Sequence, residues 1–522
     1  MKNNNINDVS IKKAKQCKEI KNYSFKKMVG KNLNKKTNSK IKCNQRENNF
    51  LKLNKIYQNN FYILLFLFIS IFIHAYQQKE ANKRKLQTNS EITITIKGKD
   101  IQKILSDSYS SPLPDIILIN GIPTSIGKSI SDLNQEPNNI TLRWNSDIIN
   151  CKDMFLGLDN ILNVDLTGFN AANVEDMSYM FSECRSLETV EINDFNSPNL
   201  NDMNHMFYAC TSLKSIDFKN IDTSQVTDMN NMFLDCLQLT SIGLSNFNTN
   251  SVQDFNHMFY NCIGLTSLNL NNFNTISAVH MNHMFDKCIN LKYLNIENFN
   301  TIIVEESKNM FGDCNSLISL DVSNFNMPNN KNMEYMFGGC SKIESLDLTN
   351  FNAQKVEIMG SIFQGCSSLT SLDLSSFSSE QIGLMGHAFG WCSSLESIEF
   401  GQNFKTHNAG YMDGLFEGCI NLKSLNLSIF NTEKAVTLEN MFSGCSSLTS
   451  LDLSNFITNN CDNFKNMFKE CKKLTSLNLS NLNTSKVKNM DSMFKGCNLL
   501  ESLDISGFNT ESNTNMNEMC MG

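Results

Sequence analysis

Leucine and phenylalanine recur over residues 151–522 in a pattern typical of a short strand. Leu448, Leu451 and Leu453 follow Cys445, and Phe456 comes three residues later. Because side chains alternate between the two faces of a strand, we expect Leu451 and Leu453 to point inward together. The same spacing recurs at Leu369, Leu372, Leu374 and Phe377, and at Leu265, Leu268, Leu270 and Phe273. The pattern predicts one strand per copy, and stacked copies would form a long parallel sheet.

A second apolar pattern precedes each of these strands. Val487, Met490, Met493, Phe494 and Cys497 are separated by one, three or four residues. Such spacing is typical of one face of an amphipathic helix about three turns long. Several copies carry a Gly immediately before the Cys, and Gly commonly ends a helix in the left-handed conformation. Each copy is therefore predicted to contain a strand, an Asn-rich turn, a short helix and a tight return.

The two patterns repeat at a fixed period, which the cysteines mark. Eleven of the twelve intervals between them are 26 residues, and the interval from 392 to 419 is 27. An earlier copy has Leu158 at the Cys position, so about fourteen copies are present. Such a period indicates a solenoid, in which stacked neighbours bury what one copy cannot. The expected fold class is α/β, a solenoid like that of leucine-rich repeats, with a concave parallel β-sheet and short helices on the convex side. The cysteines lie at 184, 210, 236, 262, 288, 314, 340, 366, 392, 419, 445, 471 and 497.

The residues before the repeats divide by composition and charge. Residues 1–60 carry a balance of +13, which leaves −20 for the rest because the whole chain is −7. A basic leader before an acidic body argues against nucleic-acid binding by the body. Residues 61–76 form a hydrophobic run. This run favours either a signal anchor, with the leader cytoplasmic, or the core of a cleaved signal peptide. The predicted segments are a disordered basic leader (1–60), the hydrophobic run (61–76), a linker (77–91), a β-rich lead-in that caps the array (92–150) and the repeats (151–522).

The repeat resembles a known family in its full motif. The motif is Asn489-Met-x-x-Met-Phe-x-x-Cys497-x-x-Leu500-x-x-Leu503-Asp504-Ile505-x-x-Phe508-Asn509-Thr510. It resembles the BspA-like leucine-rich repeat surface proteins, in particular their mycoplasma-lipoprotein-type repeat, and the resemblance covers about 151–522. The resemblance implies surface display, adhesion and no catalytic activity. Ordinary leucine-rich repeats have Asn three residues after the last Leu, whereas Phe456 takes that place here, so a different turn is expected.

Three further columns of the repeat, of Cys, Asn and His, have structural interpretations. Each Cys falls on an apolar face, where a small hydrophobic side chain packs well. A ladder of buried free thiols is favoured over occasional disulfides between neighbouring copies. An Asn column, which includes Asn274 and Asn300, is expected to satisfy the backbone of the turns. Several His share one position before the Met-Phe pair, and His280 forms H-x-x-H with His283. Exposed polar residues are favoured there over a metal site.

An acidic column carries the functional hypothesis. Between the inward residues of each predicted strand lies an outward side chain, which is most continuously acidic at Asp321, Asp347, Asp373 and Glu399. Adjacent carboxylates repel one another unless they are screened or bound by a cation. We call these four residues the acidic strip. It is a candidate site for basic ligands or a divalent cation, and the alternative is that these residues are solvated and suited to turns.

The sequence thus predicts a binding protein and not an enzyme. We expect no catalytic residues, no metal site and no cofactor, because no catalytic constellation stands apart from the repeat pattern. The expected partners are a protein or glycan ligand of unknown identity, the membrane through residues 61–76, and no nucleic acid. The expected location is the cell surface or membrane, as a single-pass protein with a cytoplasmic N-terminus, or the secreted fraction. The alternative function is an intracellular protein–protein interaction scaffold.

Overall fold

The computed structural model describes residues 90–521 apart from 134, 193–194 and 513–514. The basic leader, the hydrophobic run 61–76 and nearly all of the linker therefore lie outside the described residues. Everything described belongs to one compact unit that begins at residue 87. Within the described residues, no helix is both long and apolar enough to cross a bilayer.

The segment before the repeats forms antiparallel strands. β1 (Ser90–Ile96) alternates buried and half-buried residues, which is the pattern of a strand with one face on a core. It pairs with β6 (Asn138–Trp144), and β6 pairs in turn with β3 (Ile116–Ile119). β3 forms a hairpin with β4 (Ile122–Thr124), while β2 (Asp100–Lys103) pairs with β5 (Ser129–Leu133). The other edge of β1 pairs with β7 (Ile161–Asp165), the strand of the first repeat, so that edge is covered.

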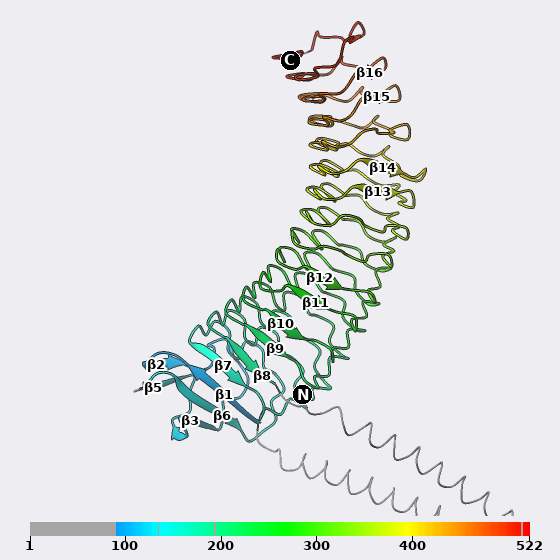
Figure 1. Cartoon of the computed structure of the whole chain (residues 1–522). Coiled ribbons are helices and arrows are strands. Elements are labelled where there is room, and N and C mark those ends of the chain that lie inside the picture. Colours follow the sequence, from blue (N-terminus) through cyan, green and yellow to red (C-terminus); the bar gives the residue numbers. More distant parts are fainter. Residues whose placement is uncertain (1–89, 134, 193–194, 513–514, 522) are drawn as a thin grey trace, which may run out of the picture. The chain divides into compact units, whose positions relative to one another are not determined.

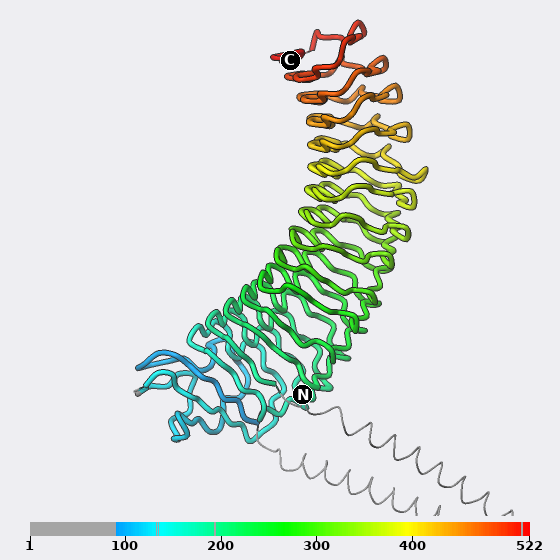
Figure 2. Tube along the Cα trace, viewed as in Figure 1, coloured from blue at the N-terminus to red at the C-terminus, as the bar shows by residue number. Residues whose placement is uncertain are grey.

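The repeats form coils that lie in sequence order, each beside the next (Figures 1 and 2). Their strands pair in parallel with a register of one repeat, as Ser371 does with Ser397. The expected single long sheet is instead interrupted. β7 to β10 continue one sheet with β1, and later strands pair two by two. The coil strands after β7 are β8 (Thr189–Glu191), β9 (Ser215–Asp217), β10 (Ser241–Gly243), β11 (Ser267–Asn269), β12 (Tyr293–Asn295), β13 (Ser371–Leu374), β14 (Ser397–Phe400), β15 (Ser450–Asp452) and β16 (Ser476–Asn478).

The expected helices on the convex side are wrong. Among the described residues the chain has no helix, and the Met-Phe-Cys segments are successive β-turns. Met180 N–H donates to Met177 O at 3.2 Å, and Cys184 N–H donates to Phe181 O at 3.1 Å. The third residues of these turns, Tyr179 and Glu183, have φ of 56° and 59°. Positive φ at that place is typical of type II turns and stops a right-handed helix at every fourth residue.

Hydrogen bonds between coils explain why turns replace helices. Phe181 N–H donates to Met206 O of the next coil at 2.9 Å, and Tyr179 N–H donates to Asn204 O at 3.0 Å. Alternate amides are thus used between coils, where an α-helix would need them within the segment. The three-and-four spacing predicted burial correctly, because Met177 and Met180 are fully buried. A tandem of four-residue turns buries the same positions as a helix does. The expected α/β class is therefore wrong, and the described residues form a β-solenoid of stacked parallel strands and turns.

The core is a set of ladders that cross all the coils. One Phe column lies three residues before the Cys position of each repeat. Its rings stack on one another from Phe155 to Phe494, with centroids of neighbouring rings 5.3–6.0 Å apart. Centroid separations of this size favour aromatic pairs beyond the burial of their area. Leu451 and Leu453 are 4% and 0% exposed, as the strand pattern predicts.

The predicted ladder of free thiols is confirmed. All sixteen described cysteines are free, and only Cys497 and Cys520 are not buried. Cys184 Sγ–H donates to Phe155 O of the preceding coil at 3.0 Å, and the equivalent bond recurs to Cys497 at 3.0–3.2 Å. Burial raises the pKa of the Cys210 thiol well above its usual value, so the thiol stays protonated and remains a donor. Cys therefore supplies both a small apolar side chain and a partner for a backbone carbonyl.

The left-handed turn positions lead to a first prediction. Ala209 has φ of 54° and is the third residue of the turn that ends at Cys210. A β-carbon in this conformation costs roughly 1–2 kcal/mol, and Gly avoids that cost. We expect Ala209→Gly to raise the free energy of unfolding by about 1 kcal/mol in a urea titration of the full chain. Ala435→Gly is the control, because Ala435 is buried without positive φ, and it should be destabilising. Equal effects of the two changes would contradict the assignment.

Candidate functional site

The acidic strip lies on the outward face of the coil strands. Asp373 and Glu399 are directly opposite each other in the paired strands β13 and β14. Asp321 and Asp347 belong to two coils outside the named strands. All four side chains are exposed. The structure thus places two of the predicted residues side by side, and like charges directly opposite each other are destabilising by roughly 0.2–1 kcal/mol.

Three of these carboxylates also cap the turn that follows the strand. Asp321 Oδ1 accepts from the Ser323 N–H at 3.0 Å and from the Ser323 hydroxyl at 2.6 Å. Asp373 Oδ1 accepts from the Ser375 N–H at 2.8 Å. Hydrogen bonds from the serine side chains lower the pKa of both Asp321 and Asp373, so both are ionised at neutral pH. Asp347 caps Thr349 N–H in the same way, whereas Glu399 has no such role. The same cap is made by Asn269 and Asn478 in their own coils, which explains why both Asp and Asn occur in the column.

A second acidic row lies inside the segment that was predicted to be helical. Asp176, Asp202, Asp228 and Asp254 follow one another in an unbroken parallel ladder of single bridges. Each accepts a hydrogen bond at 2.8–2.9 Å from the backbone N–H two residues on. Burial raises the pKa of Asp202 and Asp228, and the neighbouring aspartates raise it further. The stacking of these aspartates was not predicted because the segment was expected to be a helix, although Asp recurs visibly at the repeat period in the sequence.

This second row leads to a prediction for pH dependence. Asn332 and Asn489 occupy the same column and cap the same turn, so Asp228→Asn keeps the cap and removes the charge. The pKa of Asp228 is raised in the folded chain, so the folded state binds the proton more readily and the wild type loses stability as pH rises. We expect the variant to gain about 0.5–1 kcal/mol at pH 7 and nothing below the carboxyl's unfolded pKa of about 3.9. Urea titrations at pH 7 and pH 3.5 measure both values, and an equal gain at the two pH values would rule out this cause.

The histidines that share one repeat position, at 205, 257, 283 and 387, occupy half-buried left-handed turn positions, whereas His280 lies in the ladder of single bridges. His257 and His283 stack at 4.6 Å, and burial lowers the pKa of His257 to about 4. His387 lies 3.4 Å from carboxylate oxygens of both Asp413 and Glu417, and its interactions with these two carboxylates raise its pKa to about 9. In the described part of the chain, no three His, Cys, Asp or Glu side chains form a group that could hold a metal ion.

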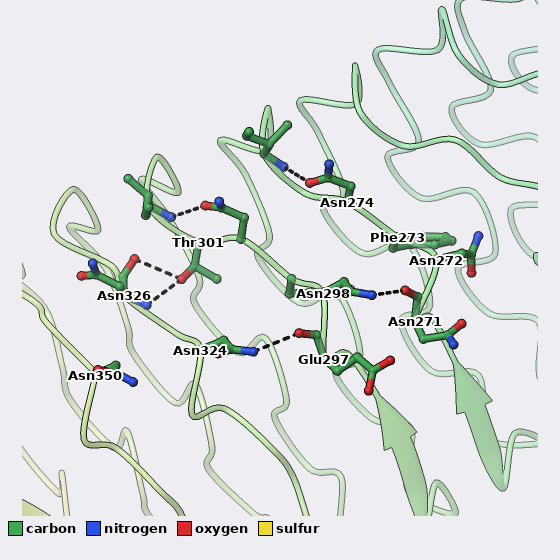
Figure 3. A pocket seen from close by; sticks show the side chains of 14 residues that line it. Asn271, Asn272, Phe273, Asn274, Glu297, Asn298, Thr301, Asn324, Asn326 and Asn350 are labelled. Carbon is green, nitrogen blue, oxygen red and sulfur yellow. Dashed lines mark hydrogen bonds between the residues drawn. The ribbon is translucent and has the colours of Figure 1, made fainter.

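A groove rich in asparagine lies where the strands β11 and β12 run into their turns (Figure 3). Its volume is about 740 Å³, and fourteen residues of four neighbouring coils line it. In one row, Asn298 Nδ2 donates to Asn271 O at 2.5 Å and Asn324 Nδ2 donates to Glu297 O at 3.0 Å. This row could not be singled out from the sequence, because its members resemble the other turn asparagines of the repeats.

The second row in the groove is the Asn column that was expected to satisfy turns. Asn274 Oδ1 accepts from the Ile276 N–H at 3.2 Å, and Asn300 Oδ1 accepts from the Ile302 N–H at 3.1 Å. The structural role is therefore confirmed for these residues. It fails at Asn326, where the residue two positions on is proline and offers no N–H, and Asn326 Oδ1 is buried without a partner among the described residues.

The repeat region matches one protein family along most of its length. The family is described as "Mycoplasma protein of unknown function, DUF285", and its matches cover residues 124–241, 202–317, 279–399, 385–478 and 474–522. Together these segments span about three quarters of the chain. The chain belongs to the DUF285 family. The mycoplasma-type repeat expected from the motif is thus confirmed. The description assigns no function to DUF285, so function has to be argued from this chain's own residues. The search of curated proteins found no match.

Three solved structures align with this DUF285 chain at low similarity. The Drosophila Toll–Spätzle complex aligns at 14% identity and a TM-score of 0.23, over 58% of this chain and 37% of the other. A leucine-rich repeat protein from Eubacterium ventriosum aligns at 17% and 0.28, over 64% and 82%. The TLR13–ssRNA13 complex aligns at 17% and 0.20, over 68% and 62%. The chain thus spans little more than a third of the first of these proteins. With such TM-scores, none of these alignments bears on function.

Proposed function

We propose that this protein binds macromolecules through the outward columns of its coil stack and is displayed on the cell surface or secreted. In this proposal it is a BspA-like adhesion or recognition protein and has no catalytic activity. The observation that carries the proposal is the contrast between the inward and the outward columns of the repeat. The Leu, Met, Phe and Cys columns are buried and are fully accounted for by packing. The outward positions, which differ from coil to coil, are therefore the ones available to contact a ligand.

The acidic strip is the first outward feature to test for ligand binding. Changing Asp321, Asp347 and Asp373 to Asn keeps the turn cap, as Asn478 shows in its own coil, and Glu399→Asn removes the fourth charge. The probes are hexalysine and Ca²⁺, with binding measured by calorimetry and by the calcium-dependent shift in Tm. We expect the fourfold variant to lose both responses.

A matched control uses the same column outside the strip. Asp165, Glu191, Asp452 and Asp504 occupy equivalent outward positions, and changing them to Asn removes the same total charge. This control variant should keep at least most of the response if the strip is a site. If hexalysine binding and the calcium shift persist unchanged in the strip variant, the strip is only a set of solvated turn caps.

Surface display has a separate test. Protease added to intact cells that express the full chain should digest the repeat region, while a cytoplasmic marker protein stays whole. Complete protection of the repeats until the cells are permeabilised would overturn surface display and favour an intracellular scaffold. Recovery of the chain from the medium would support the secreted form.

A further inference from the structure

The asparagine groove carries a regular array of side-chain amides, each of which uses only one of its two polar atoms within the protein. The Nδ2 atoms of Asn272, Asn298 and Asn324 are held by carbonyls of the preceding coil, so their Oδ1 atoms are left as acceptors. The Oδ1 atoms of Asn274 and Asn300 are held by turn N–H groups, so their Nδ2 atoms are left as donors. Within the described residues these outer atoms form no hydrogen bond. The groove thus carries a row of acceptors beside a row of donors (Figure 3).

The amides are held in place by the coils beneath them. Thr275 Oγ1 accepts from the Asn300 N–H at 2.7 Å and donates to Asn300 O at 2.8 Å. Thr301 holds Asn326 in the same manner at 2.9 and 3.1 Å, as Figure 3 shows. Both threonines are at most 1% exposed. Because side chains and backbone are both fixed before a ligand arrives, little ordering entropy would be lost on binding.

The charge of the groove selects for a neutral ligand. Of the fourteen described residues that line it, Glu297 is the one with an ionisable side chain. One wall carries Ile276 and Ile302, which are 53% and 48% exposed. A ligand that fits must therefore combine donors and acceptors without charge, and must also present C–H faces to the isoleucines. Sugar rings with free hydroxyl groups have this combination, since each hydroxyl both donates and accepts.

The spacing of the array favours a sugar chain over a peptide. Neighbouring coils in a parallel stack repeat at about 4.8 Å, and one unit of an extended pyranose chain has a similar rise. An extended peptide repeats the groups on one side only every two residues, at about 6.7 Å, and would lose register within a few coils. We propose that the groove is a binding site for a neutral, extended oligosaccharide that runs across the coils, with one sugar unit to each coil.

A variant that keeps the fold separates this site from general binding. Asn→Asp at 274 and 300 retains the Oδ1 cap and removes the outward Nδ2 donors. Asp222 already occupies this column and accepts from the Ser224 N–H at 3.0 Å, so the change is compatible with the turn. The matched control is Asn→Asp at 431 and 509, which lie in the same column and cap Glu433 and Glu511 outside the groove.

The experiment titrates the full chain with neutral hexasaccharides, namely maltohexaose, cellohexaose, chitohexaose and mannohexaose, and follows binding by calorimetry and saturation-transfer NMR. We expect at least one to bind saturably, with roughly tenfold weaker binding in Asn274→Asp/Asn300→Asp and no change in Asn431→Asp/Asn509→Asp. Ile276→Ser/Ile302→Ser should also weaken the binding of the same hexasaccharide.

Three outcomes would overturn the proposal. They are failure of every hexasaccharide to bind, equal effects of the two Asn→Asp pairs, and groove-dependent binding of an acetylated Gly-Ser hexapeptide in place of any sugar. The inference shares with the proposed function only the premise that the coil stack binds a ligand. The hexalysine and protease experiments test the acidic strip and the cellular location with other probes and other variants. Failure of either therefore leaves the groove result interpretable, and the reverse also holds.

Discussion

Phe311→Ala is expected to lower the free energy of unfolding by about 3–5 kcal/mol. The Phe311 side chain is fully buried and stacks on Phe285 and Phe337, with both pairs of centroids 5.6 Å apart. Truncation leaves a cavity and breaks the ladder on two sides at once. In a stack where each coil contacts only its neighbours, the loss cannot be spread along the array. A urea titration of the full chain measures it, and native-state hydrogen exchange should show faster exchange in the coils nearest residue 311.

An exposed aromatic residue of a nearby coil gives the control. Tyr293 is 61% exposed on the outward face of β12, and Tyr293→Ala should change stability by no more than about 0.5 kcal/mol. If Phe311→Ala costs less than about 1 kcal/mol, the Phe ladder is not the common core of the coils and the packing argument for the inward columns fails with it.

The sequence predicted the inward half of the structure correctly because packing leaves little freedom there. Leu451 and Leu453 alternate as a strand requires, and both are buried. The position of each Cys between two apolar patterns predicted the ladder of free thiols. Such columns depend only on period and polarity, which a single sequence displays directly.

The helices were predicted wrongly because burial at positions three and four apart does not distinguish a helix from tandem turns. Tyr179 and Glu183 have positive φ, and neither Tyr nor Glu is a residue type from which this conformation would be predicted. Gly and Asn at the equivalent positions, such as Gly339 and Asn309, were the available signal, because type II turns favour them at the third residue. Gly339 was instead interpreted as the end of a helix.

The outward features were harder to predict for a related reason. The row from Asp176 to Asp254 lies in the segment assigned to helices, so its stacking was not expected. The groove depends on which end of each amide is used, and Asn272 and Asn274 use opposite ends. Composition cannot reveal that choice, since it follows from the backbone groups that the neighbouring coil presents.

A threonine that joins neighbouring coils provides the second large effect. Thr432 is fully buried, and its Oγ1 accepts from the Ile457 N–H at 2.8 Å and donates to Ile457 O at 3.0 Å. Thr432→Val keeps the shape but leaves both backbone groups without this partner. Each buried group left unsatisfied costs about 1–3 kcal/mol, so we expect the free energy of unfolding to fall by roughly 2–4 kcal/mol. The same urea titration measures the loss.

Thr432→Ser separates the hydroxyl from the shape of the side chain. Ser379 fills the same column and keeps longer versions of the two bonds, at 3.3 and 3.5 Å, so serine should lose no more than about 1 kcal/mol. The column also contains Met327, which has no hydroxyl, and there the Met327 backbone N–H donates to Asn352 O at 3.0 Å instead. Asn352 Oδ1 is left buried without a partner in the described chain. A valine variant as stable as the serine variant would mean that such backbone rearrangement is general and that the threonine column does not hold the coils together.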